Sequence, residues 1–165
     1  MSATFASSLS TGAHLQLSKL VGDWEGTAKT WFEPDKLADE SPVEGTMRLI
    51  LGGRFILHEY KGSLSGKPLE GMAIIGYHIA LKKYQCAWVD SFHNGTAIMF
   101  SEGEKGDPRL SILGGYEVPE IGQHWGWRTE IEIVSESEIT ITAYNISPGG
   151  EASKATETNY KKKQS

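Results

Sequence analysis

The chain has 165 residues and a net charge of −5, with 22% charged and 39% hydrophobic residues. This length suits one domain, which buries roughly 70% of the surface that its unfolded chain would expose. The acidic balance argues against a nucleic-acid surface, because neutralising phosphates requires clustered Lys and Arg. The only basic run, Lys161 to Lys163, is interpreted as a solvated chain end.

Cysteine content and hydropathy indicate the compartment. Cys86 is the single cysteine, so no intrachain disulfide can form. Residues 1–10 lack the basic and apolar regions of a secretory signal, and no run of about 18 uncharged apolar residues is present. We therefore expect a cytoplasmic protein that does not span a membrane.

The N-terminal segment changes character at Thr11. Residues 1–10 are mostly small and polar, and we expect them to be flexible. Beyond them, apolar residues recur at helical spacing up to Gly22, a residue that commonly ends helices: Ala13, Leu17, Leu20 and Val21. The sequence predicts one short helix there.

The stretch from Gly22 to Phe32 alternates between charged and uncharged positions. The charged positions are Glu25 and Lys29, and the opposite parity begins with Trp24. A period of two residues is typical of a half-buried strand. Trp24 lies between two glycines, which suits the closed end of a small barrel, where the backbone must bend around a large side chain.

Alternation resumes after residues 33–42, which we interpret as a charged loop bounded by prolines. Asn94-Gly95 is the strongest hairpin signal in the chain. The predicted strands that follow the loop cover residues 43–51, 54–64, 69–81, 84–93, 96–103, 109–118, 124–134, 139–146 and 152–163.

Ten strands with short connections indicate an antiparallel up-and-down meander. As an open sheet it would leave two exposed edges and one unsupported face, and closure removes both problems. The predicted fold is therefore all-β: a single closed β-barrel of about ten strands with one short N-terminal helix. Such a barrel encloses side chains, and sometimes one small ligand.

Several short motifs occur together between about residue 15 and the end of the chain. They are Gly22-Asp23-Trp24-Glu25-Gly26, Leu51-Gly52-Gly53-Arg54-Phe55, His58-Glu59-Tyr60, Glu70-Gly71, Gly76-Tyr77, Trp88-Val89-Asp90-Ser91, Ser101-Glu102-Gly103, and Glu157 with Tyr160.

In this ordered set the chain resembles an uncharacterised, mainly bacterial lipocalin-like family of unknown function, and more distantly the calycin barrels. The resemblance implies one barrel domain, residues 11–165, with a central cavity, and it implies no activity. Members of that family tend to carry an acidic residue after the Gly-Tyr pair, where this chain has His78. A role that depends on that carboxylate is therefore not expected of this chain.

Strand parity selects the candidate site. It places His58 and Tyr60 on one face of their strand, Trp88 and Asp90 on one face of theirs, and Trp127 inward from a third. A mostly apolar cavity with a few convergent polar groups is typical of a small-molecule site. We expect a small apolar or aromatic ligand, with the tryptophans and Tyr60 as walls and His58 and Asp90 as polar contacts.

Other interpretations stay open. The interior of a small barrel can be filled by its own side chains. Haem could be held by one histidine, with His58, His93 and His124 as candidates. An enzyme could use His58 as a base oriented by Asp90. The histidines and Cys86 show no metal-binding spacing, so we expect neither a metal site nor a bound cofactor in the leading interpretation.

Phe55 and Leu57 fall on the other parity of their strand and would be apolar on the outer wall. We expect them to pack under the N-terminal helix, whose apolar face needs a partner. A homodimer contact is the alternative, so the sequence leaves monomer and homodimer open.

Overall fold

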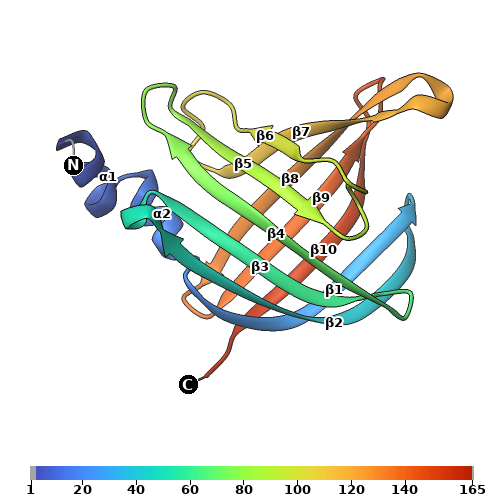
Figure 1. The fold of residues 1–165 in the computed structure, drawn as a ribbon, viewed down its shortest axis with the longest axis horizontal. Coiled ribbons are helices and arrows are strands. Elements are labelled where there is room, and N and C mark those ends of the chain that lie inside the picture. Colours follow the sequence, from blue (N-terminus) through green and yellow to red (C-terminus); the bar gives the residue numbers. More distant parts are fainter. Residues whose placement is uncertain (1–2, 165) are drawn as a thin grey trace.

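The computed structural model describes residues 3–164 and shows a closed barrel of ten antiparallel strands (Figure 1). The strands are β1 Gly22–Glu33, β2 Lys36–Ile50, β3 Phe55–Leu64, β4 Lys67–His78, β5 Lys83–Asp90, β6 Met99–Glu102, β7 Leu110–Val118, β8 Gln123–Ser135, β9 Glu138–Ile146 and β10 Ala152–Lys162.

Every strand pairs with its sequence neighbours, and pairing of β1 with β10 closes the sheet. This closed antiparallel meander confirms the predicted fold class and strand count. The connections that follow odd-numbered strands lie at one end, which we call the mouth, and the helices lie at the other (Figure 1).

The N-terminal segment differs from the expectation, since it forms two short helices in place of one. Helix α1 covers Ala3–Thr11 and helix α2 covers Ala13–Ser18. The segment expected to be flexible is therefore helical from Ala3, and residues 1 and 2 lie outside the described part. Phe5 is 5% exposed and anchors α1, because its ring meets His14 edge-on and lies under the Arg54 guanidinium.

Helix α2 closes the end of the barrel opposite the mouth. Leu17 on the helix and Leu20 in the turn after it are fully buried in the same apolar cluster as Trp24. The Trp24 Nε1–H donates to the carbonyl oxygen of Leu20 at 2.9 Å. The position of Trp24 at the closed end is thus confirmed. Leu17 of α2 packs into this interior cluster, to which neither Phe55 nor Leu57 belongs.

Two short 3₁₀ helices, η1 Leu51–Gly53 and η2 Pro119–Ile121, connect strands. The prediction of a loop over residues 33–42 is wrong, because β2 begins at Lys36 and a tight turn at Pro34 and Asp35 joins it to β1. Asp35 takes the left-handed conformation that such a turn needs. The early part of β2 is mostly exposed, so it carries charges and lacks the apolar alternation that marks a strand.

Candidate functional site

Strand parity places the candidate residues as predicted around the interior. His58, Asp90 and Trp127 are each 7–8% exposed, and Tyr60 and Trp88 are partly buried. An interior cavity of about 140 Å³, which we call the lumen, is lined by His58, Tyr60, Trp88 and Trp127 among mainly apolar side chains. Asp90 is not one of its lining residues, so four of the five predicted residues face it together.

A second cavity of about 340 Å³ lies at the mouth and is lined by aromatic side chains, among them Trp31, Phe32 and Tyr116. The two cavities share five wall residues: Thr30, Trp88, His93, Trp127 and Thr156. We call this ring the neck. Within it the Trp88 and Trp127 rings stack with centroids 5.5 Å apart, and the His93 ring lies 5.6 and 5.7 Å from them.

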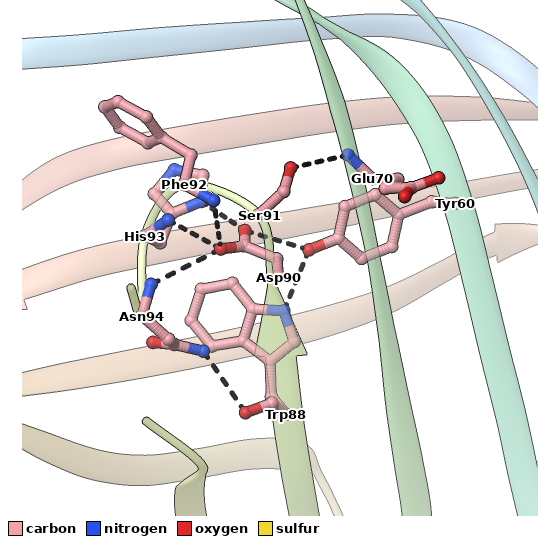
Figure 2. A network of polar contacts seen from close by, with 8 residues as sticks. All are labelled: Tyr60, Glu70, Trp88, Asp90, Ser91, Phe92, His93 and Asn94. Carbon is pink, nitrogen blue, oxygen red and sulfur yellow. Dashed lines mark hydrogen bonds and ion pairs between the residues drawn. The ribbon is translucent and has the colours of Figure 1, made fainter. Parts of the chain in front are cut away.

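The carboxylate of Asp90 organises the loop that carries His93 (Figure 2). Its Oδ1 atom accepts hydrogen bonds from the backbone N–H groups of Phe92, His93 and Asn94, at 2.5 to 3.3 Å. Its Oδ2 atom is 2.5 Å from His93 Nδ1 and accepts from the Tyr60 hydroxyl at 3.1 Å. The Asp90 side chain thereby fixes the loop that leaves β5 and orients the imidazole.

These hydrogen bonds decide the charge of Asp90. Burial alone would raise the pKa of this carboxyl, but the ring of His93 and the backbone N–H groups of Phe92 and His93 together hold that pKa below its ordinary value. Asp90 is therefore an ionised carboxylate at neutral pH. Burial raises the pKa of Tyr60, and the Asp90 charge raises it further, so Tyr60 remains a neutral phenol.

His58 lines the lumen and is bonded to a tyrosine. Its Nε2 atom lies 3.0 Å from the hydroxyl of Tyr160, and burial lowers its pKa to about 4, which makes it neutral at pH 7. The alternative in which Asp90 orients His58 as a base is not the arrangement found, because Asp90 is bound to Tyr60 and His93. The carboxylate of Asp90 pairs instead with the imidazole of His93, three residues later in the chain.

Two glycines give the buried tyrosines room to lie across the neighbouring strands. Tyr60 lies between Gly45 on β2 and Gly71 on β4 in the strand register. A Cβ atom at Gly45 would overlap the Tyr160 hydroxyl, and one at Gly71 would overlap the Tyr60 hydroxyl. The hydrogen bonds that the Tyr60 and Tyr160 hydroxyls make therefore depend on these positions having no side chain.

His93 is the residue that the site prediction missed, although it was a haem candidate. The Asn94-Gly95 pair suggested a two-residue hairpin, but β5 ends at Asp90 and β6 begins at Met99, so His93 lies in a connecting loop. The signal that could have found it is an Asp followed three residues later by His where a strand ends, since Asp side chains commonly accept from the next backbone N–H groups.

The remaining reactive groups offer little chemistry. Burial raises the pKa of the Cys86 thiol to about 12, so it is a poor nucleophile. His124 is 64% exposed and bonded to Glu117, which removes it from the haem candidates inside the barrel. Within residues 3–164, no cluster of three or more His, Cys, Asp or Glu residues could hold a metal ion. The described helices are too short and polar to cross a membrane.

Comparison with solved structures finds other barrels at low sequence identity. An S-type phycobiliprotein lyase, CPES from Guillardia theta, has a TM-score of 0.54 at 10% identity, and the match covers 92% of each chain. A de novo designed fluorescence-activating β-barrel has a TM-score of 0.48 at 14% identity, with 89% of this chain and 96% of that one covered. The first of these similarities supports the fold alone.

A protein of unknown function from the DUF3598 family of Nostoc punctiforme gives a TM-score of 0.41 at 13% identity, covering 90% of this chain and 49% of that one. No curated protein matches. The sequence profile of the family described as "Protein of unknown function (DUF1579)" matches residues 10–162, nearly the whole barrel and helix α2. The chain therefore belongs to the DUF1579 family.

Proposed function

We propose that this protein binds a small apolar or aromatic molecule at the neck of the barrel, between the lumen and the mouth cavity. The observation that carries the proposal is the His93 Nε2 atom, which is buried and has no hydrogen-bond partner within residues 3–164. Leaving a buried polar atom unpaired costs about 1 to 3 kcal/mol, and a ligand that pairs with it recovers that cost.

The surroundings of this nitrogen suit an aromatic ligand. Trp88 and Trp127 present a stacked pair of indoles, and both cavities are lined largely by apolar and aromatic side chains. The lumen alone is smaller than a usual ligand pocket of roughly 300 Å³ or more, whereas the mouth cavity reaches that size. We therefore place the ligand across the neck, with part of it in each cavity.

Titration with a panel of aromatic metabolites, flavonoids and fatty acids tests this proposal. Tryptophan fluorescence and melting temperature are followed in the wild type, in Trp127→Phe and in Trp125→Phe. Trp125 lines neither cavity and serves as the matched control. We expect quenching and stabilisation that Trp127→Phe weakens and Trp125→Phe preserves. Absence of both signals throughout the panel would contradict the proposal.

Haem binding is the second candidate, and the same nitrogen favours it. Metal-ligating histidines usually donate their other ring N–H to a carboxylate, which is the arrangement of His93 and Asp90. The macrocycle would have to lie in the larger mouth cavity. Titration with hemin should then give a Soret band that His93→Ala abolishes and His124→Ala leaves intact. A band that survives His93→Ala, or no band, excludes this candidate.

We further propose a cytoplasmic location for this lipocalin-like carrier. A buried, unpaired thiol at Cys86 is compatible with a reducing compartment, where proteins keep free cysteines. Fractionation of cells that express the tagged protein tests this location, and recovery in an extracellular fraction would contradict it.

A further inference from the structure

The hydrogen bonds around Asp90 determine which nitrogen of His93 carries a proton. The Trp88 Nε1–H donates to the Tyr60 hydroxyl at 2.8 Å, and an indole nitrogen can only donate. The Tyr60 hydroxyl therefore accepts from Trp88 and uses its own hydrogen for Asp90 Oδ2 at 3.1 Å. The Tyr60 hydroxyl and three backbone N–H groups thus all donate hydrogen bonds to the Asp90 carboxylate. The imidazole of His93 is the other group in contact with it.

An ionised carboxylate has no hydrogen to give, so the close contact between Asp90 Oδ2 and His93 requires the proton to be on Nδ1. In a neutral imidazole only one nitrogen carries hydrogen, and Nε2 must then present a bare lone pair. This lone pair is buried and has no partner among the described residues, although His93 is one of the five residues that border both cavities.

We infer that the ligand class is a flat aromatic molecule carrying a hydroxyl or ring N–H group, whose hydrogen is donated to His93 Nε2. This inference rests on the proposed function and specifies its chemistry. Trp88 and Trp127 supply aromatic surface within 6 Å of the imidazole, so the donor and the ring system of one molecule can be recognised together.

Discrimination should be strong against an analogue without the donor hydrogen. A site built around a buried acceptor rejects such an analogue because the acceptor stays unpaired when the analogue binds. A difference of about 1.4 kcal/mol corresponds to a tenfold change in Kd. Phenols, indoles and other ring N–H compounds should bind, whereas their O-methyl or N-methyl derivatives should bind at least about tenfold more weakly.

Calorimetric titration with 2-naphthol and 2-methoxynaphthalene tests this preference at about pH 8, where free imidazole is neutral. The wild type should prefer 2-naphthol by at least about tenfold. His93→Phe keeps a ring beside the indoles and removes the acceptor, so the variant should bind both probes alike. Equal binding of both probes by the wild type, or a preference that persists in His93→Phe, would overturn the inference and leave the proposed function standing.

Nitrogen-15 NMR of the histidine side chains provides a test that needs no ligand. The His93 signals, assigned by their loss in His93→Phe, should show a protonated Nδ1 and an unprotonated Nε2 at about pH 8. A protonated Nε2 would overturn the inference directly. If the Nδ1–H form is observed while neither the naphthalenes nor any member of the panel binds, the assignment of the acceptor holds and the proposed function fails.

Discussion

His58 shows how one buried residue links the barrel interior to pH. Its imidazole is 8% exposed, and its described ring bond is to the Tyr160 hydroxyl. Removal from water penalises the charged form, which is why its pKa falls from the ordinary 6.5 to about 4. The folded chain therefore holds this histidine neutral over a pH range in which the unfolded chain protonates it.

The first prediction follows from that difference. Between pH 6.5 and pH 4 the unfolded state binds a proton that the folded state does not, so the free energy of unfolding should fall as the pH is lowered through this window. Across this window, His58 alone should lower the free energy of unfolding by about 3 kcal/mol. His14, whose pKa is also lowered by burial, acts in the same direction.

Urea unfolding at several pH values between 7 and 4 measures this effect. His58→Gln should show a shallower decrease than the wild type, whereas the exposed-site control His124→Gln should match the wild type. An unchanged slope in His58→Gln would contradict the assignment. Each slope is compared within one protein, so a loss of stability in His58→Gln at pH 7 does not obscure the result.

At the scale of elements, helix α2 is a six-residue helix too short to be stable alone. Its stability comes from Leu17, which packs into the end of the barrel beside Trp24, together with Leu20 of the turn that follows the helix. The turn after the helix supplies the Leu20 carbonyl oxygen, which accepts a hydrogen bond from the Trp24 indole N–H and so ties the end of α2 to β1. We therefore expect α2 to be part of the cooperative barrel unit.

The second prediction concerns the packing of helix α2 against the end of the barrel. Leu17→Ala should lower the free energy of unfolding by about 2 to 5 kcal/mol, because it removes a fully buried side chain and leaves a cavity. Gln16→Ala changes an exposed residue on the same helix and should have an effect within about 0.5 kcal/mol. Chemical denaturation measures both variants. A loss below about 1 kcal/mol for Leu17→Ala would indicate that α2 is a detachable appendage.

Sequence alternation predicted the inner faces of β3, β5 and β8 because each runs straight through the barrel wall with one face buried. His58, Tyr60, Trp88 and Trp127 were therefore placed correctly. Sequence alternation failed where hydrogen bonds from a side chain, and not strand pairing, determine the path of the backbone. The Asp90 carboxylate ends β5 and holds His93, and no residue period encodes that interaction.

At the scale of the whole molecule, the closure of the barrel could also be predicted from the sequence. Ten short-linked strands have few alternatives to a closed meander, so strand count and connection length were sufficient. The size of the lumen could not be predicted in this way, because it depends on how far each interior ring fills the space. The lumen volume of about 140 Å³ depends on how the Tyr60 and Tyr160 side chains extend across neighbouring strands. Gly45 and Gly71 leave the space for this arrangement.

The closing seam between β1 and β10 joins the two ends of the barrel, and Gly26 faces Tyr160 across it. A Cβ atom at Gly26 would overlap the backbone carbonyl oxygen of Asn159, which cannot move without separating the paired strands. Gly26→Ala should therefore lower the free energy of unfolding by at least about 3 kcal/mol, beyond the usual cost of a single substitution.

Gly149→Ala provides the matched control for this third prediction. The atom nearest to its added Cβ is 3.8 Å away, which is an ordinary van der Waals contact. The melting temperature of Gly26→Ala should fall by at least about 10 °C, while that of Gly149→Ala should stay within a few degrees of the wild type. Because the seam closes the whole sheet, hydrogen exchange in Gly26→Ala should accelerate in β5 as well as in β1 and β10. Faster exchange confined to β1 and β10 would mean that the remaining strands form a stable open sheet, and that closure is not what holds the neck residues in place.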